Sequence, residues 1–468
     1  MPTPLASPTP SWTADPRVRW AVALVLPGGA AVWLHSLGLG VPLVLFTLIT
    51  LWALCLWAME LLPDALVAVL IPILYIVTGV GKPAQILSPW TLSIGWLVLG
   101  GLMIGAFMMK TGLARRLALR SIQAVGGSFL RLLWGILLAG LIMAPFIPSV
   151  LGRSSILTVV CIGVCQALDL KKYSREASAV ILAGFVAVAA PKLAFLTGGA
   201  DIAMAMNLGA QVTGVQVTWL QYSLHNFLPA LLYGILSMLC IIVMLRPKIE
   251  ASVYPIINAQ LASLGPMSRN EYKSMGLLCL LLLLLVSDSL HGVNVGWIML
   301  LLPSLAFFPG IGLLDKQDFG KLNFTAVFFI TGCMSIGAAA KASGMDKVLA
   351  DSLLPLLSGS ELYTVMATYV AGIGFNALLT PLAAYASLTT ALTEIAIQLQ
   401  VPPLLVLYTY NYGLDQYLFP YEYPVLLFFY ATGYVSLNTV IKVMGLRMLV
   451  AAPFIAGIAY PYWKYCLQ

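Results

Sequence analysis

SIGWLVLGGLMIGAFMMKTGLARRLA (residues 93–118) and TAVFFITGCMSIGAAAKASGMDKVLA (residues 325–350) align without a gap, and this internal repeat decides which fold we expect. Each copy is a glycine-rich apolar run followed by a short amphipathic run. The first amphipathic run is rich in arginine, whereas the second continues as GMDKVLADSLLPLLSGSE (344–361), which carries three acidic residues. We therefore expect the copies to face opposite sides of a membrane, as inverted repeats. Seven aligned pairs are identical: Gly100/Gly332, Ile104/Ile336, Gly105/Gly337, Ala106/Ala338, Gly112/Gly344, Leu117/Leu349 and Ala118/Ala350.

Composition places the chain in a membrane. Of the 468 residues, 61% are hydrophobic and 9% are charged, and the mean hydropathy is +0.97, which is more apolar surface than one water-soluble core can hide. Apolar windows of roughly 20 residues, enough to cross about 30 Å of hydrocarbon, recur along almost the whole length. We expect an all-α polytopic membrane protein with these apolar segments: 19–38, 42–61, 63–80, 91–110, 129–168, 177–206, 222–245, 276–290, 295–312, 323–341, 362–397, 404–435 and 440–461.

The repeat divides the chain into four parts. We expect residues 1–18 to form a flexible N-terminal tail and 19–245 to hold the first helix and the first repeat. The polar stretch 246–275 is expected to be a cytoplasmic linker, and 276–468 the second, inverted repeat.

Each repeat contains an apolar stretch broken by Gly, Pro or Ser in its middle, followed by a span interrupted at Gly or Pro. This pattern predicts two re-entrant hairpins, at 129–168 and 362–397. Inverted repeats with broken helices are typical of secondary transporters, whose ligands bind near the membrane midplane. The alternative is that these residues only kink ordinary helices.

Several classes of protein are disfavoured. The seven cysteines show no CxxC or CxxH spacing and the three histidines no metal-binding spacing, so we expect no metal site and no cofactor. No GxSxG or paired catalytic pattern points to an intramembrane enzyme. We expect no nucleic-acid partner, because an excess of Lys and Arg in a membrane protein usually reports orientation.

The basic residues predict an orientation in the plasma (inner) membrane. With a cytoplasmic N-terminus, eighteen Lys and Arg, Arg116 and Arg447 among them, fall on the cytoplasmic side and four on the other. The C-terminus is then expected outside. Arg153 and Lys192 are left at membrane depth.

Arg153 lies in PSVLGRSSI (148–156), between two apolar runs. An ionisable residue at membrane depth costs roughly 2.5–3.5 kcal/mol on insertion scales, so it is rarely present without a partner or a ligand. The sequence therefore predicts that Arg153 pairs with a carboxylate or binds an anion.

The chain resembles the divalent anion/sodium symporter family of dicarboxylate, citrate and sulfate carriers over nearly its whole length. The resemblance implies eleven spans, arranged as one helix plus two inverted five-span repeats, with two re-entrant hairpins. It also implies a homodimer formed through a scaffold, and an elevator motion of the hairpin domain. The order and spacing of these stretches carry it: WAMELLPDALVAVLIP (57–72), LVLGGLMIGAFMMKTGLARRLAL (97–119), LTGGAD (196–201), TWLQYSLHNFLPALL (218–232), VPP (401–403), FPYEYP (419–424) and YATGYVSLNTVIKVMGLRML (430–449).

The chain departs from the family at the ligand positions. A Ser-Asn-Thr triplet is usual at each hairpin tip, whereas here the first is Gly152-Arg153-Ser154. The family's spacing puts Thr380-Pro381-Leu382 at the second tip, while the ungapped internal repeat pairs Arg153 with Tyr385. The usual Gly-Gly of the first interrupted span is Pro191-Lys192, and the Thr-Pro-Pro-Asn turns are Gly199-Ala200-Asp201-Ile202 and Tyr423-Pro424-Val425-Leu426.

Arg153 is predicted to replace a sodium ion. Its guanidinium is charged at every physiological pH and presents a fork of donors that fits carboxylate, sulfonate or sulfate. A sodium ion about 4 Å away would be repelled by about 4 kcal/mol at an effective dielectric constant of 20. The expected substrate-binding residues are Gly152, Arg153, Ser154, Ser155, Lys192, Thr197, Gly198, Thr380, Pro381, Tyr423 and Pro424.

Three acidic residues are candidate proton carriers: Asp415, Glu422 and Asp201. Burial can raise the pKa of a carboxyl group enough for that role. The alternative is that they neutralise Arg153 and Lys192 as structural ion pairs. The tyrosines between 408 and 423 could line a cavity or pack at the membrane interface.

The sequence favours a secondary transporter of a small organic or inorganic anion, such as a di- or tricarboxylate, a sulfonate or sulfate. Sodium-independent exchange or proton coupling is expected. The alternatives are a sodium-coupled dicarboxylate symporter and an anion channel, and an amino-acid zwitterion would also fit the acidic candidates.

Overall fold

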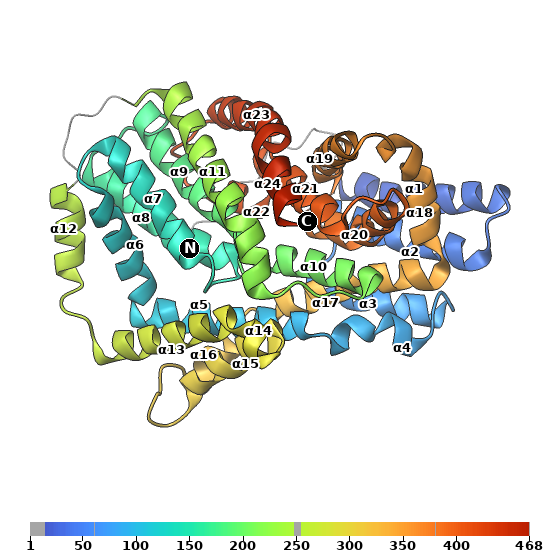
Figure 1. Ribbon diagram of the computed structural model, residues 1–468, viewed down its shortest axis with the longest axis horizontal. Coiled ribbons are helices and arrows are strands. Elements are labelled where there is room, and N and C mark those ends of the chain that lie inside the picture. Colours follow the sequence, from blue (N-terminus) through green and yellow to red (C-terminus); the bar gives the residue numbers. More distant parts are fainter. Residues whose placement is uncertain (1–14, 60, 248–253, 380, 468) are drawn as a thin grey trace.

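A computed structural model describes residues 15–59, 61–247, 254–379 and 381–467. Within these ranges every regular element is a helix (Figure 1). The first helices are α1 (Pro16–Ser36), α2 (Val41–Ala58), α3 (Asp64–Val77) and α4 (Pro83–Ile86), followed by a short 3-10 turn. Helix α1 begins at Pro16, and residues 1–14 of the expected tail lie outside the described part.

The two halves repeat one order of elements: a long glycine-rich helix, an amphipathic helix, a helical hairpin, an interrupted span and a long helix. In the first half these are α5 (Ser93–Thr111), α6 (Leu113–Val125), α7 (Phe129–Met143), α8 (Val150–Ala167), α9 (Arg175–Lys192), α10 (Ala200–Thr213) and α11 (Trp219–Leu245). In the second they are α17 (Phe324–Ser343), α18 (Met345–Leu357), α19 (Glu361–Leu378), α20 (Pro381–Gln398), α21 (Pro403–Gly413), α22 (Pro424–Tyr430) and α23 (Leu437–Phe454).

The remaining helices join or follow the halves. Between them lie α12 (Tyr254–Ser263), α13 (Arg269–Val286), α14 (Asp288–His291), α15 (Val295–Ser304) and α16 (Lys316–Gly320), and α24 (Tyr460–Cys466) comes last. The stretch expected to be a linker, 246–275, therefore contains α12 and the first turns of α13. Arg116 on α6 pairs with Glu271 on α13 and donates to the carbonyls of residues 264–266, which fixes this stretch against α6.

Glycines identical in the two copies have the same structural task. Gly112 and Gly344 end α5 and α17 in the left-handed region, with φ of +83° and +81°, where a side chain would be strained. A side chain at Gly100 would overlap the Met299 carbonyl on α15, and one at Gly332 the Ala68 carbonyl on α3. The repeated glycines therefore turn each chain into its amphipathic helix and let each long helix cross a neighbour closely.

The two halves are intertwined. Figure 1 shows the first hairpin, α7 and α8, beside α6 and α9, and the second hairpin, α19 and α20, beside α18 at the other side of the molecule. The half-helix α10 of the first half packs on α20 of the second hairpin, whereas α22 of the second half packs on α8 and α9. Each interrupted span thus reaches into the opposite half.

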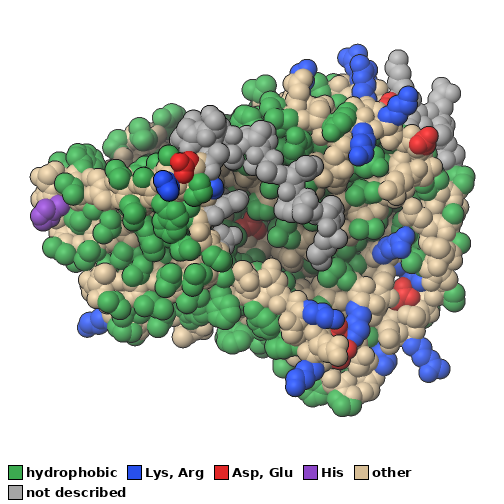
Figure 2. Space-filling view, turned by 180° about the vertical axis from the view of Figure 1, so that it is seen from behind, with side chains coloured by type: hydrophobic (Ala, Val, Ile, Leu, Met, Phe, Trp, Pro, Cys, Tyr) green, Lys and Arg blue, Asp and Glu red, His purple; other side chains and the backbone are tan. Residues whose placement is uncertain are grey.

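Six helical stretches among the described residues are long and apolar enough to cross a membrane: 16–36, 93–111, 150–167, 219–245, 324–343 and 437–466. Four shorter apolar helices accompany them. The segments expected at 177–206 and 404–435 are interrupted, at residues 193–199 (break 1) and 414–423 (break 2). Figure 2 shows a broad hydrophobic surface on one half of a face, with Lys and Arg chiefly on the other half.

Two basic residues counted on the cytoplasmic side are buried in the structure. Arg116 is 6% exposed and Arg447 2% exposed. Each is buried because a carboxylate neutralises it, Glu271 for Arg116 and Asp415 for Arg447. These two charges do not bear on orientation, which remains a prediction from the other basic residues.

Candidate functional site

A cavity of about 220 Å³ lies where both hairpins and both interrupted spans meet. The first half supplies the start of α8 and the start of α10, and the second half supplies the equivalent starts of α20 and α22. Two long helices that are partners in the internal repeat, α5 and α17, close the other wall. The lining residues are Val98, Leu102, Pro148, Ser149, Val150, Leu151, Ala200, Asp201, Ala326, Phe329, Ile330, Pro381, Leu382, Tyr423, Pro424 and Val425.

Arg153 lies one helical turn below this cavity. Ser149 caps the N-terminus of α8 by accepting from the Gly152 amide, and it lines the cavity. Arg153 stands four residues later, on the same face of the helix, and a helical side chain leans back toward the N-terminus. The sequence therefore directs the guanidinium toward the cavity end of α8.

The Arg153 side chain is fully buried and only partly hydrogen-bonded. Its Nη2 donates to the Gly198 carbonyl in break 1, while Nε and Nη1 donate to no group among the described residues. Within the described ranges no carboxylate forms an ion pair with it, although Asp201 and Tyr423 are near enough to interact electrostatically. Buried polar groups are almost always hydrogen-bonded, and an uncompensated buried charge is costly. Two free donors on a buried cation are typical of a site that receives an anion.

Lys192, in contrast, is neutralised. Its Nζ lies 2.9 Å from Asp201 Oδ2 and 3.5 Å from Asp415 Oδ1, and 4.9 Å from the centre of the Tyr423 ring. Arg447 on α23 pairs with Asp415 Oδ2 and donates to the Asp415 carbonyl and Ser237. We call Lys192, Asp201, Asp415 and Arg447 the buried charge network. The distances favour the ion-pair alternative for Lys192.

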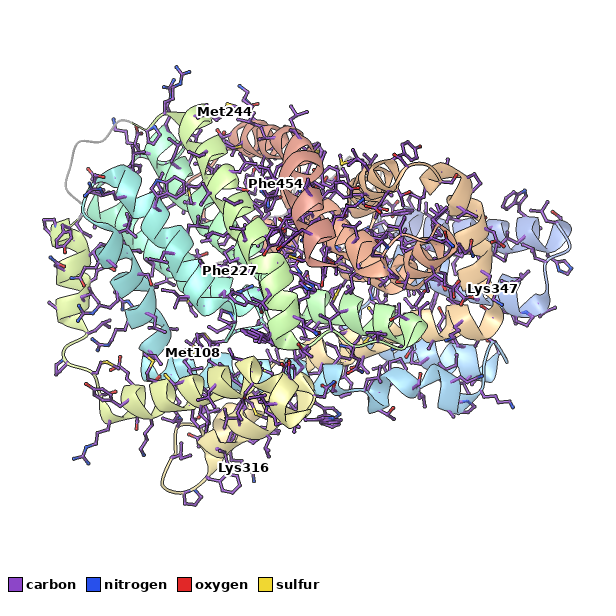
Figure 3. The ribbon with its side chains drawn as sticks, in the orientation of Figure 1. Met108, Phe227, Met244, Lys316, Lys347 and Phe454 are labelled. Atoms are coloured by element: carbon purple, nitrogen blue, oxygen red, sulfur yellow. The ribbon has the colours of Figure 1, made fainter. Side chains whose placement is uncertain are left out.

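Side chains from α11 and break 2 contact the buried charge network and fix its geometry. Tyr233 lies under the Arg447 guanidinium, 4.7 Å from ring centre to Cζ, and its hydroxyl donates to Asp415 Oδ2 and accepts from Gln416. Phe454 on α23 stacks on the other side of Tyr233, 5.9 Å between ring centres. Figure 3 marks Phe454 beside α11, whose length is marked by Phe227 and Met244. This packing leaves Asp415 no contact with water.

Thr197 and Gly198 hold break 1 rather than facing open space. Thr197 donates to the Pro145 carbonyl at the base of the first hairpin tip and accepts from the Trp219 indole. A side chain at Gly198 would overlap the Lys192 carbonyl, so only glycine lets this carbonyl turn reach Arg153. Both residues position the hairpin tip against break 1.

The serines beside Arg153 are bonded within their own helix. Ser154 Oγ donates to the Val150 carbonyl and Ser155 Oγ to the Gly152 carbonyl. Their donor hydrogens are therefore already used. Gly152 supplies one amide to the Ser149 cap.

The second half contributes neutral groups. Three of the expected substrate-binding residues line the cavity, namely Pro381, Tyr423 and Pro424. Thr380 lies outside the described residues. Tyr385, the partner of Arg153 in the ungapped repeat, is fully buried in α20, and its hydroxyl has no hydrogen-bond partner in the described part of the chain.

The three acidic candidates occupy different environments. Asp201 lines the cavity and pairs with Lys192, and Asp415 lies deeper between Lys192 and Arg447. Glu422 accepts from the Leu418 amide within break 2 and forms no ion pair with a described residue. The fold therefore brings Asp201 and Asp415 together and keeps Glu422 apart from the network.

Arg447 is a residue of this region that the sequence analysis did not identify as a buried charge. The signal was present, because Arg447 stands in the middle of the apolar run VMGLRMLVAAPF (443–454). The cost of a charge at depth, used for Arg153, applies equally there. No feature of the sequence indicated that Arg447 pairs with Asp415, 32 residues earlier in the chain.

The chain matches the sequence pattern of the sodium:sulfate symporter transmembrane region over residues 20–467. An uncharacterized transporter of Haemophilus influenzae is 26% identical over 283 residues, which are 59% of each chain. A citrate/succinate antiporter of Escherichia coli is 27% identical over 212 residues, 43% of each chain. An L-tartrate/succinate antiporter of Shigella flexneri is 23% identical over 376 residues, 74% of each. The chain thus spans less than two thirds of the length of several relatives that it matches.

Proposed function

Because the chain belongs to the sodium:sulfate symporter family, we propose that this multi-pass membrane protein is a secondary transporter of a small anion, working by sodium-independent exchange. Relatives named as antiporters of citrate, tartrate and succinate support exchange of organic anions. Succinate, other carboxylates, sulfonates and sulfate are the candidate classes.

The free donors of Arg153 carry this proposal. A cation buried without a carboxylate and with Nε and Nη1 unbonded is costly in the empty protein. An incoming anion supplies the missing charge and acceptors, and charge-assisted hydrogen bonds to a guanidinium are the strong kind. The N-terminus of α8 adds a favourable partial charge on the same side.

Arg153 also disfavours sodium coupling. A fixed guanidinium stands at the position where the resemblance implies a sodium-binding Ser-Asn-Thr triplet, and it repels a cation at about 4 Å by about 4 kcal/mol at an effective dielectric constant of 20. The second triplet is expected at Thr380-Pro381-Leu382, of which only Thr380 has a side-chain oxygen.

Exchange is favoured over proton coupling by the ion pairs. Asp201 pairs with Lys192, and Asp415 pairs with Lys192 and Arg447, so both carboxylates are already engaged as structural ion pairs. Glu422 lacks contact with the network and so cannot couple its protonation directly to the anion.

The arrangement of the cavity supports an elevator mechanism. One wall is made of hairpin starts and break residues, and the other of the long helices α5 and α17. We propose that the hairpins and interrupted spans move together against a scaffold containing α5 and α17. The homodimer, the eleven spans and the cytoplasmic N-terminus belong to the same proposal.

Counterflow in proteoliposomes tests the proposal with the variant Arg153→Met. Vesicles loaded with unlabelled succinate, sulfate or butyrate are given the labelled anion, with and without sodium and with an imposed pH gradient. We expect sodium-independent uptake by the native protein, and at least a tenfold loss in Arg153→Met. Arg120→Gln, which removes an exposed arginine from α6, is the matched control and should transport normally.

The melting temperature separates binding from structure. If Arg153 binds the anion, replacing its unpaired charge by methionine leaves the empty protein as stable or more stable; a structural ion pair would instead lose about 3–5 kcal/mol. Normal uptake by Arg153→Met contradicts the assigned role, and strict sodium dependence of the native protein contradicts the coupling.

A further inference from the structure

We infer that the cavity binds an anion with a single charged group and an otherwise uncharged body, such as an aliphatic monocarboxylate or monosulfonate. This rests on the proposed anion transport and narrows its substrate class. It departs from the dianions named for the antiporter relatives.

The charge balance at the site leaves one positive charge. Lys192 and Arg447 are matched by Asp201 and Asp415, all four of them buried. Of the three cations Lys192, Arg447 and Arg153, Arg153 is the one without a carboxylate partner among the described residues. One negative group on the ligand therefore neutralises the site, whereas a dianion would leave an excess negative charge in a buried place.

The cavity offers no cation for a second charged group. Among the described residues, its lining contains no Lys, Arg or His, and its one carboxylate is that of Asp201. Most of the lining is apolar and includes Phe329, Ile330, Leu382 and Val425. A second carboxylate against this lining would lose water without gaining a counter-charge, which is unfavourable.

Three buried tyrosine hydroxyls of the second half do not provide a site for a second carboxylate. Tyr385, Tyr417 and Tyr423 each have a buried hydroxyl without a partner in the described ranges. These hydroxyls could donate to a ligand, but Tyr385 and Tyr417 both lie within electrostatic reach of Asp201 and Asp415. A carboxylate there would meet two like charges, whereas a neutral oxygen or an apolar group would not.

The volume agrees with a small ligand. At about 220 Å³ the cavity is below the roughly 300–1,000 Å³ of pockets for drug-sized molecules. Arg153 stands four residues beyond the lining residue Ser149 on α8, so we propose that the head group binds at this end of the cavity and that a short aliphatic body occupies the apolar remainder.

Butyrate and succinate test the inference, because they share a four-carbon chain and differ by one carboxylate. We expect butyrate to compete for labelled-anion exchange in proteoliposomes at least tenfold more strongly than succinate. A stronger effect of succinate, or equal effects, overturns the single-charge inference while leaving anion exchange in place. If neither they nor sulfate is exchanged or bound, the proposed function itself is overturned.

A charge added at the second tip gives an independent test. Leu382→Lys places a cation in the apolar lining and should raise the relative effect of succinate at least tenfold. Gln398→Lys adds the same charge at the other end of α20, about 24 Å along the helix at 1.5 Å per residue, and should leave the preference unchanged. A preference for succinate that is already present in the native protein and in Gln398→Lys counts against the inference.

Discussion

The buried charges differ in how they are compensated. Asp415 forms ion pairs with both cations of the network and accepts a hydrogen bond from Arg447, while Asp201 accepts from Lys192 and from the Ile202 amide at its own helix start. Removing one member of such a group strands another charge in a medium that solvates it poorly. Arg153 is the exception, since its removal strands no charge among the described residues and takes a donor only from the Gly198 carbonyl.

Replacement of Arg447 by methionine and of Asp415 by asparagine should be strongly non-additive. Each single variant leaves a buried charge with too few partners and should lose about 3–5 kcal/mol of unfolding free energy. The double variant removes both charges, so its loss should be smaller than the sum by about 2–3 kcal/mol. Thermal unfolding of the detergent-solubilised protein measures all four corners of the cycle. Additive losses would show that the two side chains do not interact.

Gly198→Ala should impair the site without touching a charge. The added methyl overlaps the Lys192 carbonyl, so the chain of break 1 must shift and move the Gly198 carbonyl away from Arg153. We expect a loss of about 1–3 kcal/mol in unfolding free energy together with weaker anion binding. Gly276→Ala in α13 is the control, because nothing lies near its added methyl and alanine favours a helix by up to about 1 kcal/mol. Equal effects of the two substitutions would contradict the close contact.

At the scale of elements, the amphipathic helices connect the hairpins to the rest of the molecule. The first, α6, is tied to the stretch before α13 by Arg116, Glu271 and three carbonyls. Its counterpart α18, marked by Lys347 in Figure 3, lies at the opposite end of the molecule from α12. The salt bridge to Glu271 belongs to α6, so it can be tested without changing α18.

Acidification should loosen the contact between α6 and α13. Burial opposes ionisation of Glu271, but hydrogen bonds from Arg116 and Ser268 outweigh it and hold the pKa of Glu271 below its ordinary value of 4.5. A depressed folded-state pKa contributes stability that is complete above the unfolded value and lost as the pH falls through the folded one. Hydrogen exchange of residues 264–275 should therefore accelerate below about pH 4.5, after correction for the intrinsic rate.

Glu271→Gln should reproduce that loosening at neutral pH. We expect a loss of roughly 3 kcal/mol, at the low end for a broken buried pair because the carbonyls still accept from Arg116. Glu361→Gln is the control, since its pair with Lys464 is partly exposed and should contribute at most about 1 kcal/mol. If exchange in 264–275 is unaffected by Glu271→Gln, the salt bridge does not hold this stretch.

At the scale of the whole molecule, the unpaired charge of Arg153 should slow the return of the carrier across the membrane when no anion is bound. In the proposed elevator motion the empty hairpin domain carries this charge across the membrane. A charge at depth costs about 2.5–3.5 kcal/mol, which corresponds to about two decades in rate. Return of the empty carrier should therefore be slow, and transport should need an anion on both sides.

Uptake into vesicles preloaded with anion should be about 100-fold faster than into vesicles without it. The comparison uses one preparation of protein divided between the two kinds of vesicle, with the membrane potential set to zero by valinomycin and equal potassium. Equal rates in loaded and empty vesicles would show that the empty carrier returns freely and that exchange is not obligatory.

The fold class followed from the sequence, because apolar length and the glycine spacing of a repeat are local properties. The identical pairs Gly100/Gly332 and Gly112/Gly344 predicted two equivalent halves, and the structure has the same order of elements in both. The placement of Arg153 near the tip of the first hairpin could likewise be predicted, because a charge between two apolar runs is costly at membrane depth.

Only the tertiary structure decided which cations are neutralised. Lys192 is 223 residues from Asp415 in the chain but 3.5 Å from it in space, and Arg447 joins the same carboxylate from another helix. Compensation of a buried charge depends on ångström-scale distances between side chains from different helices, and no periodicity in one segment records them. For that reason the sequence could propose Arg153 and Lys192 as equivalent ligands, whereas the packing separates a neutralised lysine from an arginine with free donors.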